Sequence, residues 1–293
     1  MRFTAWLVLL ATLALWSGNW VVARAVRDDV APGIATVGRL LIVLALLLPF
    51  TSWMKLSSLG RRDWAILAAL GFTGGGVHLA LQWLGLHYTT ATSGILYLST
   101  TPIFILLLAA PLGERVGLRQ WLGVALSFAG VFLIATQGDP TRLSFNRGDL
   151  LALVSMLMWA GYTVLLRVRR DALGTLELLV LVCLFGLLFM LPWVAWESFF
   201  NPVLNITRNG LLAVLYSAIG SLLLAYAGWS YVVTRLGAAR AGATMHLMPA
   251  FGIALAALFL GEYPRWHHFV GIALILAGVA LSSLRASSAS SSR

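Results

Sequence analysis

Cysteine and charged residues are both scarce in this sequence of 293 residues. Its one cysteine, Cys183, lies within a long apolar run. A single thiol can build neither a disulfide framework nor a cysteine-based metal site, so we expect Cys183 to be a small core residue. Asp, Glu, Lys and Arg together make up 10% of the chain, which is too little for the surface of a soluble globular protein.

Hydrophobic residues are abundant in this sequence. They make up 60% of the chain, and the mean hydropathy is +0.91, far outside the soluble range. A membrane-spanning helix needs about 20 apolar residues, so ten such segments leave no room for a soluble domain. We therefore predict an all-α integral membrane protein, a single transmembrane domain over 1–293. The ten predicted helices are at about 3–23, 32–52, 64–86, 90–111, 117–136, 148–167, 175–196, 209–233, 238–260 and 266–284.

The net charge of +10 indicates membrane topology and not binding to nucleic acid, because the basic residues lie between the apolar segments. With the N-terminus in the cytoplasm, thirteen basic residues fall on the cytoplasmic side and one, Arg39, falls within a span, out of twenty in all. The remaining six fall outside: Arg24, Arg27, Arg142, Arg147, Arg208 and Arg265. We expect a multi-pass protein of the cell inner (plasma) membrane with both termini cytoplasmic, acting as a monomer.

Much of the sequence contains an internal repeat. A block containing Pro102, Leu112-Gly113-Glu114 and Gly123 recurs as Pro249, Leu260-Gly261-Glu262 and Gly271, and a shift of 143 residues places Trp16, Gly18 and Arg24 on Trp159, Gly161 and Arg167. We read two repeats, 1–137 and 148–285, followed by a polar tail at 286–293. The twin of the first segment argues against a cleaved signal peptide. Each repeat holds five spans, an odd number, so the second must be inverted, as in secondary transporters.

No acidic side chain lies deep in a predicted span, since all ten fall in loops or near span ends. Proton pumps and antiporters of lipophilic cations commonly keep a carboxylate at the midplane, so a small multidrug cation antiporter is disfavoured. His78 and His246 are the titratable groups deep in spans, and two interpretations stay open: a role in proton coupling or hydrogen bonding within the bundle. Motifs of the Gly-x-Ser-x-Gly and His-Glu-x-x-His kinds are absent, and we expect no enzyme, no metal and no cofactor.

Uncharged polar and aromatic residues cluster at depths where they rarely face lipid. Trp16 and Trp159, equivalent in the two repeats, are expected on opposite walls of one cavity. The predicted substrate-binding residues are Trp16, Asn19, Trp20, His78, Gln82, Tyr97, Ser99, Thr101, Trp159, Tyr162, Thr163, Tyr226, Ser230 and His246. An alternative is that part of this set only holds helices together. Trp83 and Trp229, nearer to span ends, suit either the cavity or the interfacial belt.

Such a cavity suits a small zwitterion such as an amino acid. Its ammonium can lie over an aromatic ring, an interaction of up to about 2 kcal/mol when desolvated, while its carboxylate takes amide, hydroxyl and imidazole donors. Pro102 and Pro249 each remove a helix hydrogen bond, and we interpret these equivalent prolines as hinges. Glu114 and Glu262 suit either gating ion pairs with arginines or ordinary solvation at helix ends.

The sequence resembles the drug/metabolite transporter superfamily in its ten-helix EamA branch, and within it the YddG-type exporters of aromatic amino acids. The resemblance covers almost the whole chain and rests on Trp16-Ser17-Gly18-Asn19-Trp20, on the run that begins at Arg39 and on the paired Pro…Leu-Gly-Glu…Gly blocks. It implies a cavity lined by helices 1, 3, 4, 6, 8 and 9, with helices 5 and 10 at the periphery. It also implies a structural role for Arg39, which is the role we expect.

We therefore expect an alternating-access secondary transporter in the lipid bilayer that exports aromatic or neutral amino acids or related small metabolites. A multidrug or toxic-cation exporter is the alternative within the same class. An intramembrane enzyme and a channel are alternatives from other classes, and the channel is less favoured because pores usually need a ring of subunits.

Overall fold

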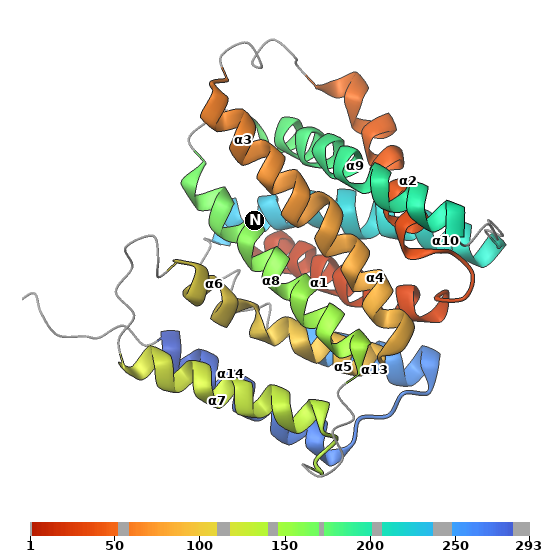
Figure 1. The fold of residues 1–293 in the computed structure, drawn as a ribbon. Coiled ribbons are helices and arrows are strands. Elements are labelled where there is room, and N and C mark those ends of the chain that lie inside the picture. Colours follow the sequence, from red (N-terminus) through yellow and green to blue (C-terminus); the bar gives the residue numbers. More distant parts are fainter. Residues whose placement is uncertain are drawn as a thin grey trace, which may run out of the picture.

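The computed structural model describes residues 2–51, 59–109, 118–139, 146–169, 173–200, 207–236 and 248–283, and over these ranges the protein is a bundle of helices (Figure 1). The helices are α1 (Arg2–Ala25), α2 (Pro32–Leu47), α3 (Arg61–Leu70), α4 (His78–Tyr88), α5 (Ala91–Tyr97), α6 (Thr101–Ala109), α7 (Leu118–Ala135), α8 (Arg147–Val168), α9 (Thr175–Phe200), α10 (Arg208–Tyr216), α11 (Ala225–Leu236), α13 (Met248–Leu260) and α14 (Trp266–Ser283).

Six helices of the described residues are long and apolar enough to cross a membrane: Phe3–Ala25, Pro32–Phe50, Arg61–Tyr88, Arg147–Leu166, Thr175–Phe200 and Arg208–Trp229. They match the first, second, third, sixth, seventh and eighth predicted spans. Shorter apolar helices lie where the fifth, ninth and tenth were expected, at Trp121–Ile134, Ala250–Leu260 and Trp266–Gly278. The total of ten spans therefore remains a prediction.

The fourth predicted span is not one continuous helix. A 3-10 turn at Leu98–Thr100 separates α5 from α6, and Pro102 is the second residue of α6. Proline lacks an N–H and disfavours the helical conformation in the residue before it, which explains why the α-helix is interrupted there. In the second repeat, Pro249 is likewise the second residue of α13. The predicted hinge motion at these prolines stays a prediction.

Two long helices are interrupted by a π-helical segment at equivalent places. Gly71–Val77 joins α3 to α4, and Ser217–Leu224 joins α10 to α11. A π-helical turn is wider than an α-helical turn and is often found at functional sites. The two halves of the chain thus repeat a local backbone feature that their amino acids hardly share.

Some helices of the first half of the chain pack antiparallel on helices of the second half. Along α7 and α14, which pair at one edge of the bundle (Figure 1), Gly138 lies against Trp266, whereas the Ser127 hydroxyl donates to the carbonyl of Ile275 at 3.1 Å. Residues late in α7 or just after it therefore contact the start of α14, and earlier residues of α7 contact its later part. The two helices are antiparallel.

The same opposed order appears at two further pairs. In α2 and α9, the amide of Gly33 donates to Glu197 near the end of α9, while Val43 lies in the same apolar cluster as Val180 near its start. In α5 and α13, Thr92 bonds to Glu262 just beyond α13, whereas Leu98, which follows α5, packs against the apolar cluster that contains Met248, the first residue of α13. The first pair joins the second and seventh predicted spans, and the other joins the fourth and ninth, in which α13 itself corresponds to α6.

Glycines allow these close approaches. A Cβ added to Gly130 would lie 2.4 Å from the carbonyl oxygen of Gly271, and one added to Gly75 would lie 2.4 Å from that of Val182. Both contacts are closer than real Cβ atoms make. The glycines of Gly71–Val77 thus let the neighbouring helices α8 and α9 approach the backbone.

Candidate transport cavity

A cavity lies inside the bundle between α1, α2, α4, α8 and the second π-helical segment. It encloses about 540 Å³ of space free of protein atoms, part of it open to solvent. The lining residues are Trp16, Asn19, Trp20, Arg39, His78, Leu79, Gln82, Leu98, Trp159, Ser217, Ser221, Leu222, Tyr226 and Met248. Residues from both predicted repeats contribute, so the cavity lies between the two halves of the chain.

Aromatic rings form the wall of this cavity. Tyr226 stands edge-on to both Trp16 and Trp159, with ring centroids 5.8 and 5.9 Å apart. Trp159 in turn stacks on Tyr162 at 5.0 Å and lies 5.1 Å from the His78 ring. Trp16 and Trp159 therefore both contact Tyr226, and the π faces are suited to a cation or to another ring.

Asn19 joins three helices at the edge of the cavity. Its Nδ2 donates to Gln82 Oε1 at 3.2 Å, and its Oδ1 accepts from the Ser217 hydroxyl. Asn19 and Ser217 are buried, as is Gln82, so these bonds satisfy polar groups that would be costly to bury alone. Asn19 thus holds α1 against the third and eighth spans as well as lining the cavity.

His78 and Trp16 each form a side-chain hydrogen bond to a backbone carbonyl oxygen. His78 Nδ1 lies 2.9 Å from the carbonyl oxygen of Ser155, which can only accept, so Nδ1 carries the hydrogen and Nε2 of the neutral ring is an acceptor. The Trp16 indole donates to the carbonyl of Ser221 at 3.1 Å. Ser221 lies in a π-helical segment, whose altered bonding pattern leaves carbonyls available to side chains.

Arg39 lies in the cavity wall with 1% of its surface exposed. Its Nη2 donates to Thr36 Oγ1 at 3.2 Å and to the carbonyl of Leu79 on α4 at 3.3 Å. The guanidinium carbon lies 4.8 Å from the centre of the Trp83 ring. The bond to Leu79 on α4 fits the expected structural role of Arg39, and the side chain also lines the cavity, which the sequence did not predict.

A second space of about 630 Å³ adjoins this cavity at Tyr226, which lines both. Its other lining residues include Tyr162, Arg169 and Thr175. Arg169 follows α8 and Thr175 begins α9, so the second space extends toward that end of the bundle.

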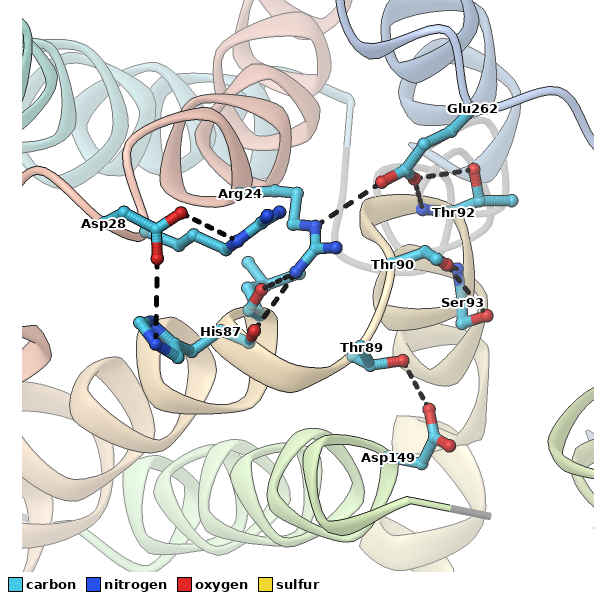
Figure 2. A network of polar contacts seen from close by, with 11 residues as sticks. Arg24, Asp28, His87, Thr89, Thr90, Thr92, Ser93, Asp149 and Glu262 are labelled. Carbon is cyan, nitrogen blue, oxygen red and sulfur yellow. Dashed lines mark hydrogen bonds and ion pairs between the residues drawn. The ribbon is translucent and has the colours of Figure 1, made fainter. Parts of the chain in front are cut away.

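A polar network joins helix ends at the opposite end of the bundle (Figure 2). Arg24 at the end of α1 lies 3.6 Å from Glu262 and donates to the carbonyls of Leu86 and His87 at 2.8 and 3.2 Å. The other carboxylate oxygen of Glu262 accepts from the amide and the hydroxyl of Thr92. The ends of α1, α4 and α13 and the start of α5 are thereby tied together, so the ion pair considered for Glu262 exists.

Figure 2 also shows Thr89 beside Asp149 at the start of α8, where the hydroxyl donates to the carboxylate. Glu114, the counterpart of Glu262, lies outside the described residues, so its predicted pairing has no structural counterpart here.

The structure brings half of the predicted binding residues to the cavity: Trp16, Asn19, Trp20, His78, Gln82, Trp159 and Tyr226. Tyr162 stacks behind Trp159, and the Thr163 hydroxyl donates to the Trp159 carbonyl at 2.9 Å. Tyr97 and Thr101 lie elsewhere: Tyr97 packs in an apolar cluster, and Thr101 contacts the sulfur of Met156 at 3.6 Å.

Three predicted binding residues have side chains outside the described part of the structure, namely Ser99, Ser230 and His246. The two tryptophans with open assignments both face inward. Trp83 is 3% exposed beneath Arg39, and Trp229 packs 5.5 Å from Trp16.

Arg39, Ser217 and Ser221 also line the cavity, with several apolar residues, and none of the three is among the predicted binding residues. Ser217 and Ser221 stand four residues apart in an otherwise apolar span, a spacing that places both on one helix face. That spacing was the available signal for this pair. For Arg39 the signal was its depth, which we attributed to a side chain reaching a neighbouring helix.

An apolar helical bundle around a central cavity of aromatic and polar side chains has the architecture of a membrane transporter. Consistent with this, the model of the EamA-like transporter family matches the chain over residues 3–136 and 146–284. The chain belongs to the EamA-like transporter family, within the drug/metabolite transporter superfamily. The family and the named relatives are transporters and not enzymes.

Similar curated proteins cover nearly the whole chain. An "uncharacterized transporter" of Archaeoglobus fulgidus is 29% identical over 95% of this chain and 97% of its own. A "probable terminal-alkyne amino-acid exporter" of Streptantibioticus cattleyicolor is 28% identical over 94% of this chain and 92% of its own. A solved crystal structure, 21% identical, superposes with a TM-score of 0.61 over 97% of both chains, which shows a shared fold.

Proposed function

We propose that this protein is a secondary transporter that exports amino acids or related small metabolites across the inner membrane by alternating access. The observation that carries the proposal is the central cavity, where Trp16, Trp159 and Tyr226 from different repeats surround one space. Among the described lining residues none is acidic, so the wall offers aromatic faces and hydrogen-bond groups and no fixed negative charge.

The two repeats, 1–137 and 148–285, are inverted relative to each other and cross the membrane five times each. The antiparallel pairing of α7 with α14, of α2 with α9 and of α5 with α13 supports this arrangement. The two separate matches to the family support the duplication. Substrate then binds between the halves, and rocking about that site alternates access.

Both termini lie in the cytoplasm, and the monomer is the working unit. In this topology the network of Arg24 and Glu262 closes the outer end, while the second space leads from Tyr226 toward the cytoplasmic end. An exporter loads its substrate from the cytoplasm, and a conformation closed outside suits that step.

Aromatic or neutral amino acids are the substrates that this cavity suits best. The ring-lined wall can take an apolar or aromatic side chain, and the name of the Streptantibioticus cattleyicolor relative supports amino-acid export. A lipophilic cation is the competing substrate class, but a cavity that contains Arg39 and no described carboxylate repels it.

A substrate panel in proteoliposomes tests this function. We expect the purified protein to move phenylalanine and leucine down their gradients, with or without a pH gradient, because no described carboxylate lies in the cavity to carry a proton. Protein-free liposomes serve as the control. Flux of tetraphenylphosphonium alone would replace the proposal with the cation exporter.

A further inference from the structure

We propose that Arg39 is a substrate-binding residue that pairs with the carboxylate of the transported molecule. This rests on the proposed function and adds the chemical class that the cavity selects: monocarboxylates with an apolar or aromatic body, with or without an ammonium group. Arg39 is a charged residue among the described residues that line the cavity, and none of these is acidic.

The guanidinium is buried without a counter-charge. Its side chain is 1% exposed, and the ion pairs among the described residues are those of Arg24, Arg27 and His87. Two hydrogen bonds from Nη2 and the Trp83 ring partly replace water, but Nε has no hydrogen-bond partner in the described structure. A buried cation without a paired anion is strongly disfavoured, so the site is incomplete until an anion arrives.

The cavity is where such an anion can arrive. Arg39 lines it together with His78 and Tyr226. Thr36, Leu79 and Trp83 occupy its other sides. The Nε–H, which has no hydrogen-bond partner in the described structure, thus belongs to a side chain that lines this cavity.

Guanidinium and carboxylate match in shape and in charge. The planar fork of arginine binds the two carboxylate oxygens in parallel, which a lysine ammonium cannot do. A phosphate dianion needs more than one cation, and the described lining supplies Arg39 alone. The aromatic wall of Trp16, Trp159 and Tyr226 takes the remainder of the molecule, so the body beside the carboxylate is apolar or aromatic.

Competition binding with three matched probes tests this assignment. Purified protein is loaded with radiolabelled phenylalanine, which is then displaced by 3-phenylpropanoate, with the carboxylate alone, or by phenylalaninamide, with the ammonium alone. We expect 3-phenylpropanoate to compete at least about tenfold better, as one charged hydrogen-bonded contact implies. In Arg39→Gln, phenylalanine affinity should fall by about tenfold or more and the preference for the carboxylate should vanish.

Two further variants separate binding from structure. Arg39→Lys keeps the positive charge but not the planar guanidinium. Compared with Arg39→Gln, it should restore part of the affinity for phenylalanine and part of the preference for 3-phenylpropanoate. Arg62→Gln removes a charge from an exposed position on α3 and should leave both unchanged. If Arg39 only held helices together, Arg39→Gln would weaken both competitors equally and lower the melting temperature of the ligand-free protein.

The outcomes also separate this assignment from the proposed function. Equal competition by the two analogues in the wild type would overturn the role of Arg39 even if phenylalanine is transported. Binding of 3-phenylpropanoate without binding of phenylalanine would support carboxylate binding by Arg39 and refute amino-acid export. If no probe binds, both fail. If Arg39→Gln does not fold, the wild type and Arg39→Lys still test the role of Arg39. Its role is supported if Arg39→Lys shows a smaller preference for 3-phenylpropanoate over phenylalaninamide than the wild type, and contradicted if the two preferences are equal.

Discussion

Replacing Trp159 with alanine should lower the kcat/KM of phenylalanine transport by about 30-fold or more. Trp159 contacts three other rings, those of His78, Tyr162 and Tyr226, and it offers a face to the aromatic body of the substrate. Losing the apolar burial and ring stacking of such a contact costs about 2 kcal/mol, a factor of roughly 30. The lost packing of the neighbouring rings adds to this. Initial rates of radiolabelled export in proteoliposomes measure the effect.

Two matched variants show whether the effect belongs to the cavity. Trp196 is 59% exposed on α9, so Trp196→Ala removes an indole that faces away from the cavity and should leave transport unchanged. Trp159→Phe keeps an aromatic face and should retain part of the rate. Melting temperatures must show that Trp159→Ala is folded. Transport by folded Trp159→Ala at the wild-type rate would contradict the assignment of this wall to the substrate.

Replacing Glu262 with glutamine should open the end of the bundle that Figure 2 shows. Glu262 binds Arg24 on one side and the start of α5 at Thr92 on the other, and a neutral amide keeps neither contact at full strength. Weakening such charged hydrogen bonds costs about 1–2 kcal/mol, which shifts an equilibrium by roughly 5- to 30-fold. The protein should therefore spend more time open at this end.

Cysteine labelling measures that shift. In a chain with Cys183→Ala, a cysteine in the cavity wall at Ser221 should react with a membrane-impermeant maleimide from the Arg24 side about 5- to 30-fold faster when Glu262→Gln is added. Asp63→Asn makes the same charge change at the other end of the third span, where Asp63 caps α3, and should not accelerate this reaction. Unchanged labelling in Glu262→Gln would show that the network does not control access.

The swap of the two charges should not restore closure. An arginine at position 262 cannot accept from Thr92, and a glutamate at position 24 cannot donate to the carbonyls of Leu86 and His87. The network depends on the donor and acceptor directions of each side chain and not only on opposite charge.

The sequence predicts the long helices and the depth of the aromatic residues because both follow from local hydropathy. Trp16 and Trp159 were placed in one cavity from their equivalence in the repeats, and both line it. The break before Pro102 also follows from the chain, since proline alone removes the hydrogen bond. These features need no knowledge of which helix packs on which.

Features that depend on packing could not be predicted in this way. Tyr97 is as polar and as deep as Tyr226, but it faces an apolar cluster of helices, and one sequence does not specify this rotation. The π-helical segment at Ser217–Leu224 likewise has no glycine run to mark it. Arg39 looked like a side chain that reaches a neighbouring helix, and it does so through Leu79, but the cavity on its other side arises from residues far along the chain.

The relative orientation of the two halves is measured most directly by labelling their equivalent ends. In cells that express the chain with Cys183→Ala, single cysteines replace Arg119 at the start of α7 and Arg265 just before α14, both of which are exposed. We expect an impermeant maleimide to reach Arg265→Cys from outside intact cells and Arg119→Cys only after permeabilisation. Labelling of both positions from the same side would contradict two inverted halves, and with them the site between the halves.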